Sequence, residues 1–290
     1  MNNPVAVPYT PGCELKPGMT PPDNAQRWAL SLEYLGRDFS GFARQASTAN
    51  TVQQHLESAL SKVACEEIQV ICAGRTDAGV HATAQVVHFD TTRLRPSKAW
   101  VLGANTYLPA SIRVHRAQPV SWQFHARFSA QARTYRYVLA SAQVPSATFC
   151  DQVSWTRFAL DLHAMQQACR FFLGEQDFTS FRTVQCQAKS PVRRIEHIQL
   201  HSVNGLFVLE ITANAFLHHM VRNIMGSLIE VGRGARPPGW IAEVLAARDR
   251  AQAAPTAQPG GLYLVGVSYP PEFGIAAVAK GPLLLPEVLG

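Results

Sequence analysis

One loop of this sequence brings together residue types that can carry out chemistry. Between Gly74 and Gly79 the chain has a single carboxylate, Asp77, two residues after Arg75. Glycine lets the backbone turn sharply and approach a ligand closely, and a loop held between strands is a good platform for a catalytic group. A carboxylate beside arginine favours its charged form, which suits a nucleophile or a base better than a proton donor. The alternative is an Asp77 that caps a turn and pairs with Arg75.

Other kinds of catalytic site find no support in the sequence. It contains no phosphate-binding P-loop, no dinucleotide-binding glycine pattern and no H-E-x-x-H motif, so we expect no cofactor. The six cysteines include no C-x-x-C pair, which favours reduced thiols in the cytosol over a disulfide framework. His218 and His219 are adjacent in a predicted helix and cannot both ligate one ion from the same helical face. We therefore expect no metal site.

Basic residues are concentrated in one part of the chain. The 290 residues carry a net charge of +6, and arginine is far more frequent than lysine. Residues 75–136 alone contain eight arginines and Lys98 against two acids, Asp77 and Asp90, which gives a net charge of +7. Exposed basic residues gathered in this way predict a surface for a polyanion such as a nucleic acid. A solvated patch without a partner and a genome that favours arginine codons are the alternatives.

The elements that must position the Asp77 loop follow a recognisable order. Alternating apolar residues predict strands at 27–34, 68–72, 83–89 and 112–117. Thr51 is the predicted N-cap of a helix that runs to Val63, and Pro96 begins a second helix that ends near Tyr107. The resulting order, β-α-β-β-α-β, is that of the split ferredoxin-like unit. The Asp77 loop lies between the second and third predicted strands.

The second half of the chain has a similar character without repeating the sequence. Helical periodicity is clearest at 216–231, and further helices are predicted at 161–173 and 240–247. The dipeptide Asn204-Gly205 is a strong turn signal for a hairpin. Strands are predicted at 134–140, 192–201, 206–212 and 262–267.

These elements predict an α+β protein made of two ferredoxin-like (RRM-like) split β-α-β halves with mainly antiparallel sheets. The halves are expected at 27–140 and 141–285, between a flexible Pro-rich tail at 1–26 and a short tail at 286–290. No apolar run approaches the roughly 18 residues of a membrane helix, and the N-terminus lacks the pattern of a secretory signal. We therefore expect a cytoplasmic protein with no membrane contact.

Short segments along the chain resemble one known family. AGRTDAGVHA at 73–82 is similar to the signature of the TruA family of tRNA pseudouridine synthases. The resemblance continues in the family's order between about residues 27 and 285. It rests on ARFSA at 126–130, TYRY at 134–137, DFTSF at 177–181, NAFLHHMVRN at 214–223, GLYL at 261–264 and GPL at 281–283. GFARQ at 41–45 departs mildly from the family pattern, with Phe42 in the aromatic position.

The resemblance implies a specific fold and reaction. The fold is the pseudouridine synthase fold, with an active-site cleft between the two halves. The implied enzyme isomerises uridine to pseudouridine at positions 38, 39 and 40 in the anticodon stem-loop of tRNA, works as a homodimer, and uses no cofactor and no metal. Because the glycosidic bond is broken and re-formed, the base must be flipped out of the stem. A related pseudouridine synthase with different uridine targets is the alternative within the same superfamily.

The family motifs imply roles for particular residues. Asp77 matches the catalytic Asp, which acts either as a nucleophile on C1′ or as a base that removes the ribose 2′ proton. Arg75 matches the group that replaces the displaced base in the RNA helix, and its alternative role is phosphate contact or turn bracing. Tyr135 matches the Tyr that stacks on the uracil and assists proton removal at C5. Tyr137 shares its strand face, so the alternative is that both are core residues.

Other positions are assigned by the family blocks or by charge. The resemblance implies that Arg222 pairs with Asp77, whereas the helical pattern alone places Arg222 on a solvated polar face with Asn223. His218 is a candidate RNA contact or a structural residue, and Leu264 is a candidate wall of the uracil pocket. Phosphate contacts are expected from a group of basic residues, namely Arg93, Arg95, Arg127, Arg133 and Arg136.

Two other classes of function compete with the synthase interpretation. A non-catalytic RNA chaperone on the same fold would keep the basic surface and the aromatic residues but would not need Asp77. A hydrolase that uses Asp77 as an acid or base would require a second nearby carboxylate, and this stretch of the sequence contains none. Neither class accounts for the complete segment around Asp77.

Overall fold

The first half of the chain forms four strands and two helices. The computed structural model describes residues 24–275, 281–282 and 285. The strands are β1 (Gln26–Tyr34), β2 (Ile71–Cys72), β3 (His81–Thr91) and β4 (Ile112–Val120). Helix α1 (Val52–Ala64) follows β1, and a π-helical turn (Ala99–Gly103) runs into α2 (Ala104–Tyr107) before β4. Strand β1 pairs antiparallel with both β3 and β4, and β2 adds to β3.

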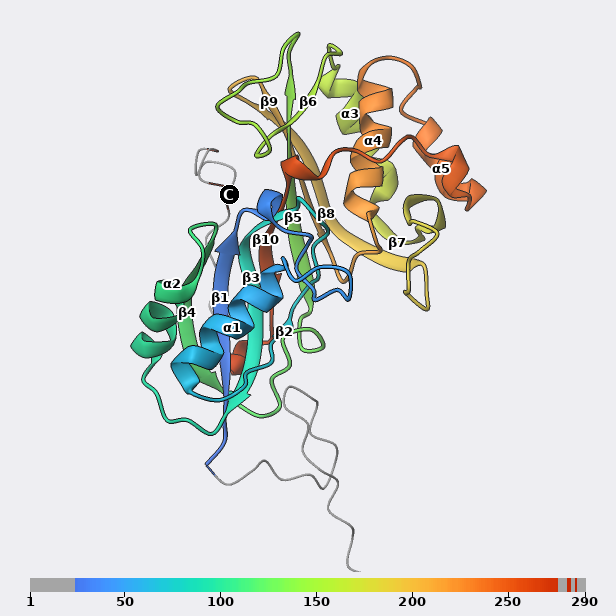
Figure 1. Ribbon diagram of the computed structural model, residues 1–290. Coiled ribbons are helices and arrows are strands. Elements are labelled where there is room, and N and C mark those ends of the chain that lie inside the picture. Colours follow the sequence, from blue (N-terminus) through green and yellow to red (C-terminus); the bar gives the residue numbers. More distant parts are fainter. Residues whose placement is uncertain (1–23, 276–280, 283–284, 286–290) are drawn as a thin grey trace, which may run out of the picture.

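The second half of the described chain adds the remaining strands and helices. The strands are β5 (Ala132–Ser141), β6 (Ser154–Thr156), β7 (Gly174–Asp177), β8 (Val192–Val203), β9 (Leu206–Ala213) and β10 (Leu262–Ser268). The helices are α3 (Leu162–Cys169), α4 (Met220–Gly232) and α5 (Trp240–Ala247). All ten strands lie in one sheet, whose main path is β4-β1-β3-β10-β5-β9-β8-β7 (Figure 1).

Each half has the strand order of a ferredoxin-like unit, β4-β1-β3-β2 in the first and β10-β5-β9-β8 in the second. This confirms the predicted α+β class with mainly antiparallel pairing. Strand β10 pairs antiparallel with β5 and also parallel with β3, so the two expected sheets are joined into one. Strand β5 pairs with β9 and β10, and it therefore groups with the second half rather than the first, where the expected boundary after residue 140 placed it.

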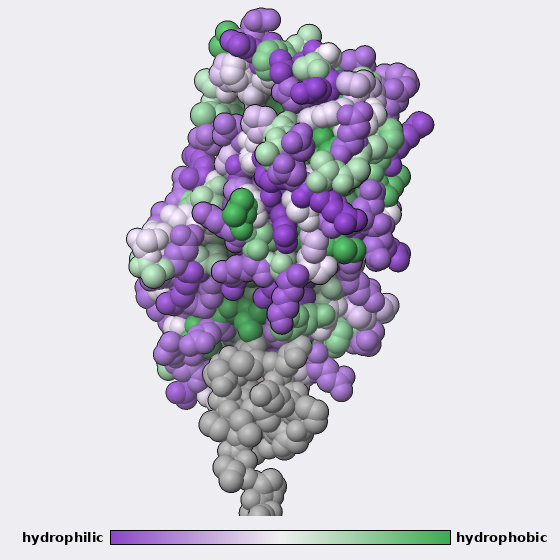
Figure 2. Space-filling model, turned by 90° about the vertical axis from the view of Figure 1, so that its right-hand side faces the viewer, coloured by the Kyte–Doolittle hydropathy of each residue, from purple (hydrophilic) through white to green (hydrophobic). Residues whose placement is uncertain are grey.

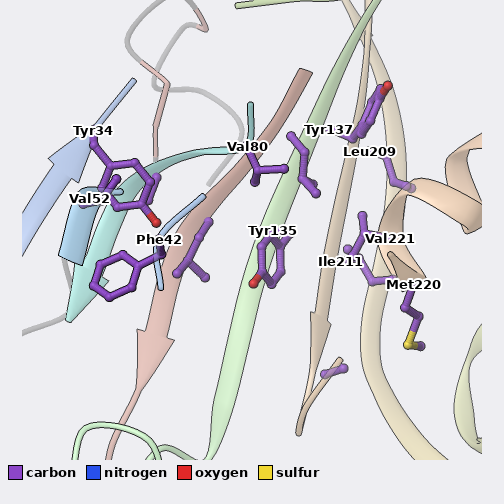
Figure 3. Packing of buried hydrophobic residues seen from close by; sticks show 14 of the residues in the cluster. Tyr34, Phe42, Val52, Val80, Tyr135, Tyr137, Leu209, Ile211, Met220 and Val221 are labelled. Atoms are coloured by element: carbon purple, nitrogen blue, oxygen red, sulfur yellow. The ribbon is translucent and has the colours of Figure 1, made fainter. Parts of the chain in front are cut away.

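One hydrophobic core crosses the junction between the halves. It includes Tyr34 and Val52 from the first half and Ile211 and Val221 from the second. Tyr135 lies between these two groups (Figure 3). Because both halves bury apolar side chains in the same cluster, the position of one half relative to the other is fixed by packing as well as by the shared sheet.

The main difference from the predicted elements lies at α4. The Thr51 N-cap of α1 is confirmed, since its side chain accepts a hydrogen bond from the Gln54 N–H. The helix predicted at 216–231 begins instead at Met220, because His219 adopts a left-handed backbone with φ +62°. Leu217 continues the apolar spacing but packs into the core from a loop. Apolar periodicity therefore extends beyond the helix that it predicts.

The predicted hairpin is confirmed, and two other helices are less regular than expected. Strands β8 and β9 turn at Asn204 and Gly205, whose φ angles of +51° and +80° are those that a two-residue hairpin turn requires. The helix predicted at 96–107 starts at Ser97 and includes a π-helical turn at Ala99–Gly103. The helix predicted at 161–173 changes to a 3-10 turn after Cys169.

The surface shown in Figure 2 is largely hydrophilic, with apolar residues scattered in small groups. None of the described helices is both long and apolar enough to cross a bilayer. Most of the expected tails (1–23 and 286–290), and Leu283 of the GPL segment, lie outside the described residues. Gln26 was expected in the N-terminal tail, but it begins β1.

Candidate active site

The Asp77 loop, residues 73–80, joins β2 to β3 and is braced by buried polar side chains. The Gln85 side chain donates to the Gly74 carbonyl at 2.7 Å and to the Tyr34 hydroxyl at 3.2 Å. The Tyr34 hydroxyl in turn lies 2.8 Å from the Thr76 hydroxyl. Gln85, Tyr34 and Thr76 are all buried, so the network is shielded from water and holds the loop rigidly. The Asp77 side chain remains 26% exposed and accessible to a ligand.

The loop that follows β1 packs directly on the Asp77 loop. The Phe42 N–H donates to the Thr76 carbonyl at 3.0 Å. Gly41 has a φ of +101°, and a Cβ at this position would lie 2.9 Å from the same carbonyl. Both the backbone conformation and the lack of space therefore require glycine here. The GFARQ segment thus acts as a support for Asp77.

The segment just before α4 brings two imidazoles to the Asp77 carboxylate. His218 Nε2 lies 3.2 Å from one carboxylate oxygen, and His219 Nε2 lies 3.3 Å from the other. Side chains adjacent in a helix point about 100° apart, so the left-handed backbone at His219 is what allows both rings to converge. His218 Nδ1 lies 2.7 Å from the Thr183 hydroxyl, which orients the ring.

Arg222 lies on the first turn of α4 and points to Asp77. Its terminal nitrogen is 3.7 Å from a carboxylate oxygen of Asp77, and its Nε donates to the Ala257 carbonyl at 2.8 Å. The Arg222 side chain is 14% exposed, so it is not part of a solvated face. Burial lowers the pKa of Arg222, and the charge of Asp77 opposes that shift. Asn223, also expected on a solvated face, is fully buried and donates to the Phe181 carbonyl at 2.8 Å.

The charge state of His219 follows from the same surroundings. Burial lowers the pKa of His219, and the negative charge of Asp77 opposes the shift, whereas Arg222 and His218 add to it. The His219 imidazole is therefore neutral at pH 7, and Arg222 is the cation that faces the Asp77 carboxylate.

Tyr135 reaches the site from β5, in the middle of the sheet. Its cross-strand neighbours are Leu264 of β10 and Ile211 of β9, and its ring meets Phe216 edge-on at 4.9 Å between centroids. Burial raises the pKa of Tyr135, and the Asp77 charge adds to the shift, so its hydroxyl is protonated at neutral pH. That hydroxyl forms no hydrogen bond with any residue that the structure describes. Leu264 is fully buried beside it.

The exposed basic residues are candidates for contact with a polyanion. Of the basic residues predicted to contact RNA, those that are exposed are Arg75, Arg93, Arg95 and Arg127. Arg93 lies 3.6 Å from Glu66, and the Arg127 guanidinium packs over the Phe128 ring. Arg75 forms no hydrogen bond or ion pair within the described part of the chain, so its guanidinium is available to a ligand.

Arg136 does not lie on the expected basic surface. It is 3% exposed, its Nε donates to the Glu210 carboxylate at 2.8 Å, and a terminal nitrogen donates to the Gly281 carbonyl at 3.1 Å. Successive side chains of a strand point to opposite faces, so Arg136 faces away from the side of the sheet that carries Tyr135. The expected phosphate contact by Arg136 is therefore wrong for this structure.

Arg133 lies on the same strand face as Tyr135 but binds backbone. All five N–H donors of its guanidinium are used by carbonyl oxygens, and none remains for a phosphate. The acceptors are the carbonyls of Ala73, Arg127, Ala130 and Asn214. Arg133 thus joins the Asp77 loop to the ARFSA segment and to the chain that leads into α4. Counting charges in the sequence did not predict this positioning role.

Sequence reasoning also missed the residues that brace the loop. Gln85 gives a signal, because it is a polar residue in the middle of the apolar stretch TAQVVHF. The prediction that His218 and His219 cannot share an ion assumes that both lie in a helix, whereas α4 begins only at Met220. Asp77, His218 and His219 each offer one ligand atom, and these atoms lie within 4.8 Å of one another. The argument that adjacent histidines cannot share an ion therefore does not apply here.

Comparisons with known proteins cover most of the chain. Residues 31–129 and 168–270 match the family model described as tRNA pseudouridine synthase. The chain is 50% identical to tRNA pseudouridine synthase A of Alcanivorax borkumensis over 91% of this chain and 98% of that protein. It is 51% identical to the Pseudomonas aeruginosa protein of the same name, over 91% and 94%.

Solved structures resemble the chain more distantly. The crystal structure of a Cbf5-Nop10-Gar1 complex aligns with 82% of this chain and 48% of that one, at 13% identity and a TM-score of 0.32, which is too low to support an argument about the site. The family model matches over two thirds of the sequence, and it includes both Asp77 and the α4 segment that meets it. On this match, and on relatives that are half identical over nearly their whole length, the chain belongs to the tRNA pseudouridine synthase family.

Proposed function

We propose that this protein isomerises uridine to pseudouridine at positions 38, 39 and 40 in the anticodon stem-loop of tRNA. Family membership supports the reaction and the substrate class. The observation that carries the assignment to this site is the partly exposed Asp77 carboxylate, which Arg222 meets at 3.7 Å from the other half of the chain. A carboxylate with a buried arginine beside it and an accessible face is suited to attack or to proton removal.

In the proposed reaction the N1–C1′ bond breaks, the uracil turns, and a C5–C1′ bond forms. C5 loses its proton and N1 takes one up, so the product is an isomer of the substrate. Asp77 either attacks C1′ or removes the ribose 2′ proton, and in both routes a negative carboxylate oxygen must face the ribose. Arg222 stabilises that negative charge. Tyr135 supports the uracil ring by stacking, and its protonated hydroxyl is free to hydrogen-bond the base during transfer of the C5 proton.

Access to a stem nucleotide requires that the base leave the helix, which costs a few kcal/mol. Arg75 precedes Asp77 by two residues and has no protein partner among the described residues, so it is placed to fill the space left by the base. Arg93, Arg95 and Arg127 supply exposed positive charge for the RNA backbone. Arg133 and Arg136 are not part of this surface, because their donors are used inside the protein.

The proposal is tested by Asp77→Asn. This variant should bind the tRNA with unchanged affinity and release no tritium from C5-labelled uridine, because the amide is neither a nucleophile nor a base. The matched control is Asp38→Asn, which changes an exposed carboxylate that pairs with its neighbour Arg37 and should keep full activity. Measurable turnover by Asp77→Asn would show that the carboxylate is not the catalytic group.

Mapping pseudouridines in the product tRNA identifies the nucleotides that the protein modifies. Pseudouridines mapped in tRNA after incubation with the wild-type protein should fall at positions 38, 39 and 40. Modification elsewhere would favour a related synthase with other uridine targets. We also propose that the protein acts as a homodimer in the cytoplasm, where its substrate is found, and sedimentation of the full chain at assay concentration tests the dimer.

A further inference from the structure

Three side chains at the Asp77 site converge with their electron-rich atoms toward one point. The Nε2 atoms of His218 and His219 lie 3.2 and 3.3 Å from the two oxygens of Asp77, and one ligand atom from each residue falls within 4.8 Å of the others. Atoms of this kind repel one another unless a proton or a cation lies between them. The His219 side chain is 24% exposed, so its Nε2 can be reached by an ion from solvent.

The spacing fits the coordination sphere of a first-row divalent ion. Zinc binds imidazole nitrogen and carboxylate oxygen at about 2.0–2.2 Å, so tetrahedral ligands lie roughly 3.3–3.6 Å apart. The distances of 3.2 and 3.3 Å from the two imidazole nitrogens, each to a different oxygen of Asp77, are close to that value, so the carboxylate can meet the ion with both oxygens. Metal-bound histidines usually have their second ring nitrogen held by a hydrogen bond. Thr183 provides such a contact to Nδ1 of His218 at 2.7 Å.

We propose that Asp77, His218 and His219 form a binding site for a divalent transition-metal ion, and that an ion bound there inhibits the enzyme. Two imidazoles and one carboxylate favour ions such as Zn²⁺ over Mg²⁺, which prefers oxygen ligands. The inhibition rests on the proposed function, because a coordinated Asp77 oxygen is not available to attack or to remove a proton. The binding itself does not depend on that function.

The position of Arg222 allows metal binding at this site to be distinguished from binding elsewhere on the chain. Its guanidinium lies 3.7 Å from an oxygen of Asp77, so it repels a second cation on the same carboxylate. Removing this charge must strengthen metal binding at this site, and it has no such effect at a site elsewhere on the chain. The Arg222→Gln variant therefore reports where the ion is bound, without any need for catalysis.

Binding is measured by calorimetric titration of chelator-treated protein with Zn²⁺, and by the visible absorption of Co²⁺. We expect one equivalent bound by the wild type, loss of that equivalent in Asp77→Asn and His219→Ala, and binding at least about tenfold tighter in Arg222→Gln. Thr183→Val leaves the three ligands in place and should weaken binding about tenfold or more, because the His218 ring is no longer oriented. Mg²⁺ should not compete.

The matched control is His163→Ala, which removes an exposed histidine on α3 and should bind Zn²⁺ as the wild type does. Each variant is checked for folding by its thermal transition before titration. Binding by His219→Ala equal to that of the wild type, or no tightening in Arg222→Gln, would overturn the site. Binding weakened about tenfold or more in a folded Thr183→Val protein supports it even where a ligand variant fails to fold.

A second measurement separates the site from the function. Zn²⁺ should inhibit pseudouridine formation by the wild type with a midpoint at the calorimetric Kd, and a chelator should restore the rate. Full activity with Zn²⁺ bound at this site would overturn the inhibition. A protein that binds the ion as described but makes no pseudouridine in metal-free buffer would contradict the proposed function and leave the metal site supported.

Discussion

Tyr135 and Tyr137 lie two residues apart on β5 and face the same side of the sheet, yet their hydroxyls have different surroundings. The Tyr137 hydroxyl lies 2.7 Å from both the Ser154 hydroxyl and the Gln258 carbonyl. The Tyr135 hydroxyl has no such partner in the described chain and sits in the electrostatic field of Asp77. The Tyr137 hydroxyl is thus held by the protein, whereas the Tyr135 hydroxyl is the one that we propose to contact the substrate.

Removal of each hydroxyl should therefore have a different effect. Tyr135→Phe should lower kcat about a hundredfold with little change in Tm, because stacking survives while the hydrogen bond to the base is lost. Tyr137→Phe should cost about 1–3 kcal/mol of stability, since buried polar partners lose a hydrogen bond, and its kcat should stay near that of the wild type. Single-turnover kinetics and denaturant titration measure the two effects. A wild-type rate for Tyr135→Phe would reduce that residue to a stacking platform.

For individual residues, family motifs predict well which side chains meet at the site. Counting charges predicts poorly which basic residues are exposed. Asp77, Arg222 and Tyr135 are found at one site, as the family segments imply. Arg133 and Arg136 were grouped by charge, although the alternation of a strand already places them on opposite faces. Their partners, backbone carbonyls and Glu210, come from distant segments and leave no local signal.

Two loops and one helix end position the Asp77 carboxylate, and each depends on a specific backbone contact. Gly41 has positive φ and no room for a Cβ beside the Thr76 carbonyl, whereas Gly205 has positive φ with open space around it. Comparing substitutions at Gly41 and Gly205 therefore separates the effect of backbone strain from the effect of a steric clash with the Asp77 loop.

Gly41→Ala and Gly205→Ala should both lose about 1–3 kcal/mol of stability through strain. Only Gly41→Ala should also lower kcat, because the added methyl group pushes the Thr76 carbonyl and hence Asp77 out of place. Equal kcat values for the two folded variants would contradict the supporting role of this loop. Turnover at saturating tRNA and thermal unfolding provide the readouts.

Arg133 connects the same elements through its guanidinium. Arg133→Met should cost roughly 2–4 kcal/mol, because the carbonyls of Ala73 and its other acceptors lose charged hydrogen bonds. It should also lower kcat while the salt dependence of tRNA binding stays unchanged, since no phosphate contact is removed. The control, Arg127→Met, removes an exposed guanidinium and should change stability by no more than about 0.5 kcal/mol while reducing the salt dependence. A shallower salt dependence for Arg133→Met would instead indicate a phosphate contact.

Among the elements, the start of α4 is the feature that the sequence could not reveal. The apolar spacing of Leu217 and Met220 is compatible with a continuous helix. The left-handed turn at His219 depends on contacts with Asp77, which is far away along the chain. A local pattern does not contain such contacts, and the departure from helical structure lies at the candidate site.

His81 links the two halves of the whole molecule through its neutral ring. Its Nδ1 accepts from the Gly36 N–H at 2.9 Å, and its Nε2 lies 2.7 Å from the Asp151 carbonyl. Burial lowers the pKa of His81 below its ordinary value of 6.5. Protonation of Nδ1 would place a proton against the Gly36 N–H and break the contact.

Stability should therefore depend on pH through His81. The unfolded chain takes up the proton near pH 6.5 and the folded protein only at lower pH, so this contribution is complete above about pH 6.5 and is lost as the pH falls below it. The slope should not exceed about 1.4 kcal/mol per pH unit. Denaturant titrations between pH 7.5 and 5.5 should show a smaller loss for His81→Gln than for the wild type. Parallel pH profiles for the two proteins would assign the effect to other groups.

For the molecule as a whole, the two ferredoxin-like halves follow from periodicity, but their junction does not. The stretch Leu262–Val267 reads as a buried strand in the sequence. Nothing local shows that it pairs with both β3 and β5, because those pairings span more than a hundred residues. Strand content is encoded locally, whereas the choice of strand partner depends on the assembled core.

The central position of β10 has a consequence for how the protein is synthesised. Every other described strand precedes it in the chain, and yet it lies in the middle of the sheet, between β3 and β5. While the ribosome has not yet released Leu262 and the residues after it, the gap between these strands is open. Leu264, which completes the wall beside Tyr135, is then also missing. Translation that stops early therefore yields a chain that lacks the strand by which the sheets of the two halves are joined.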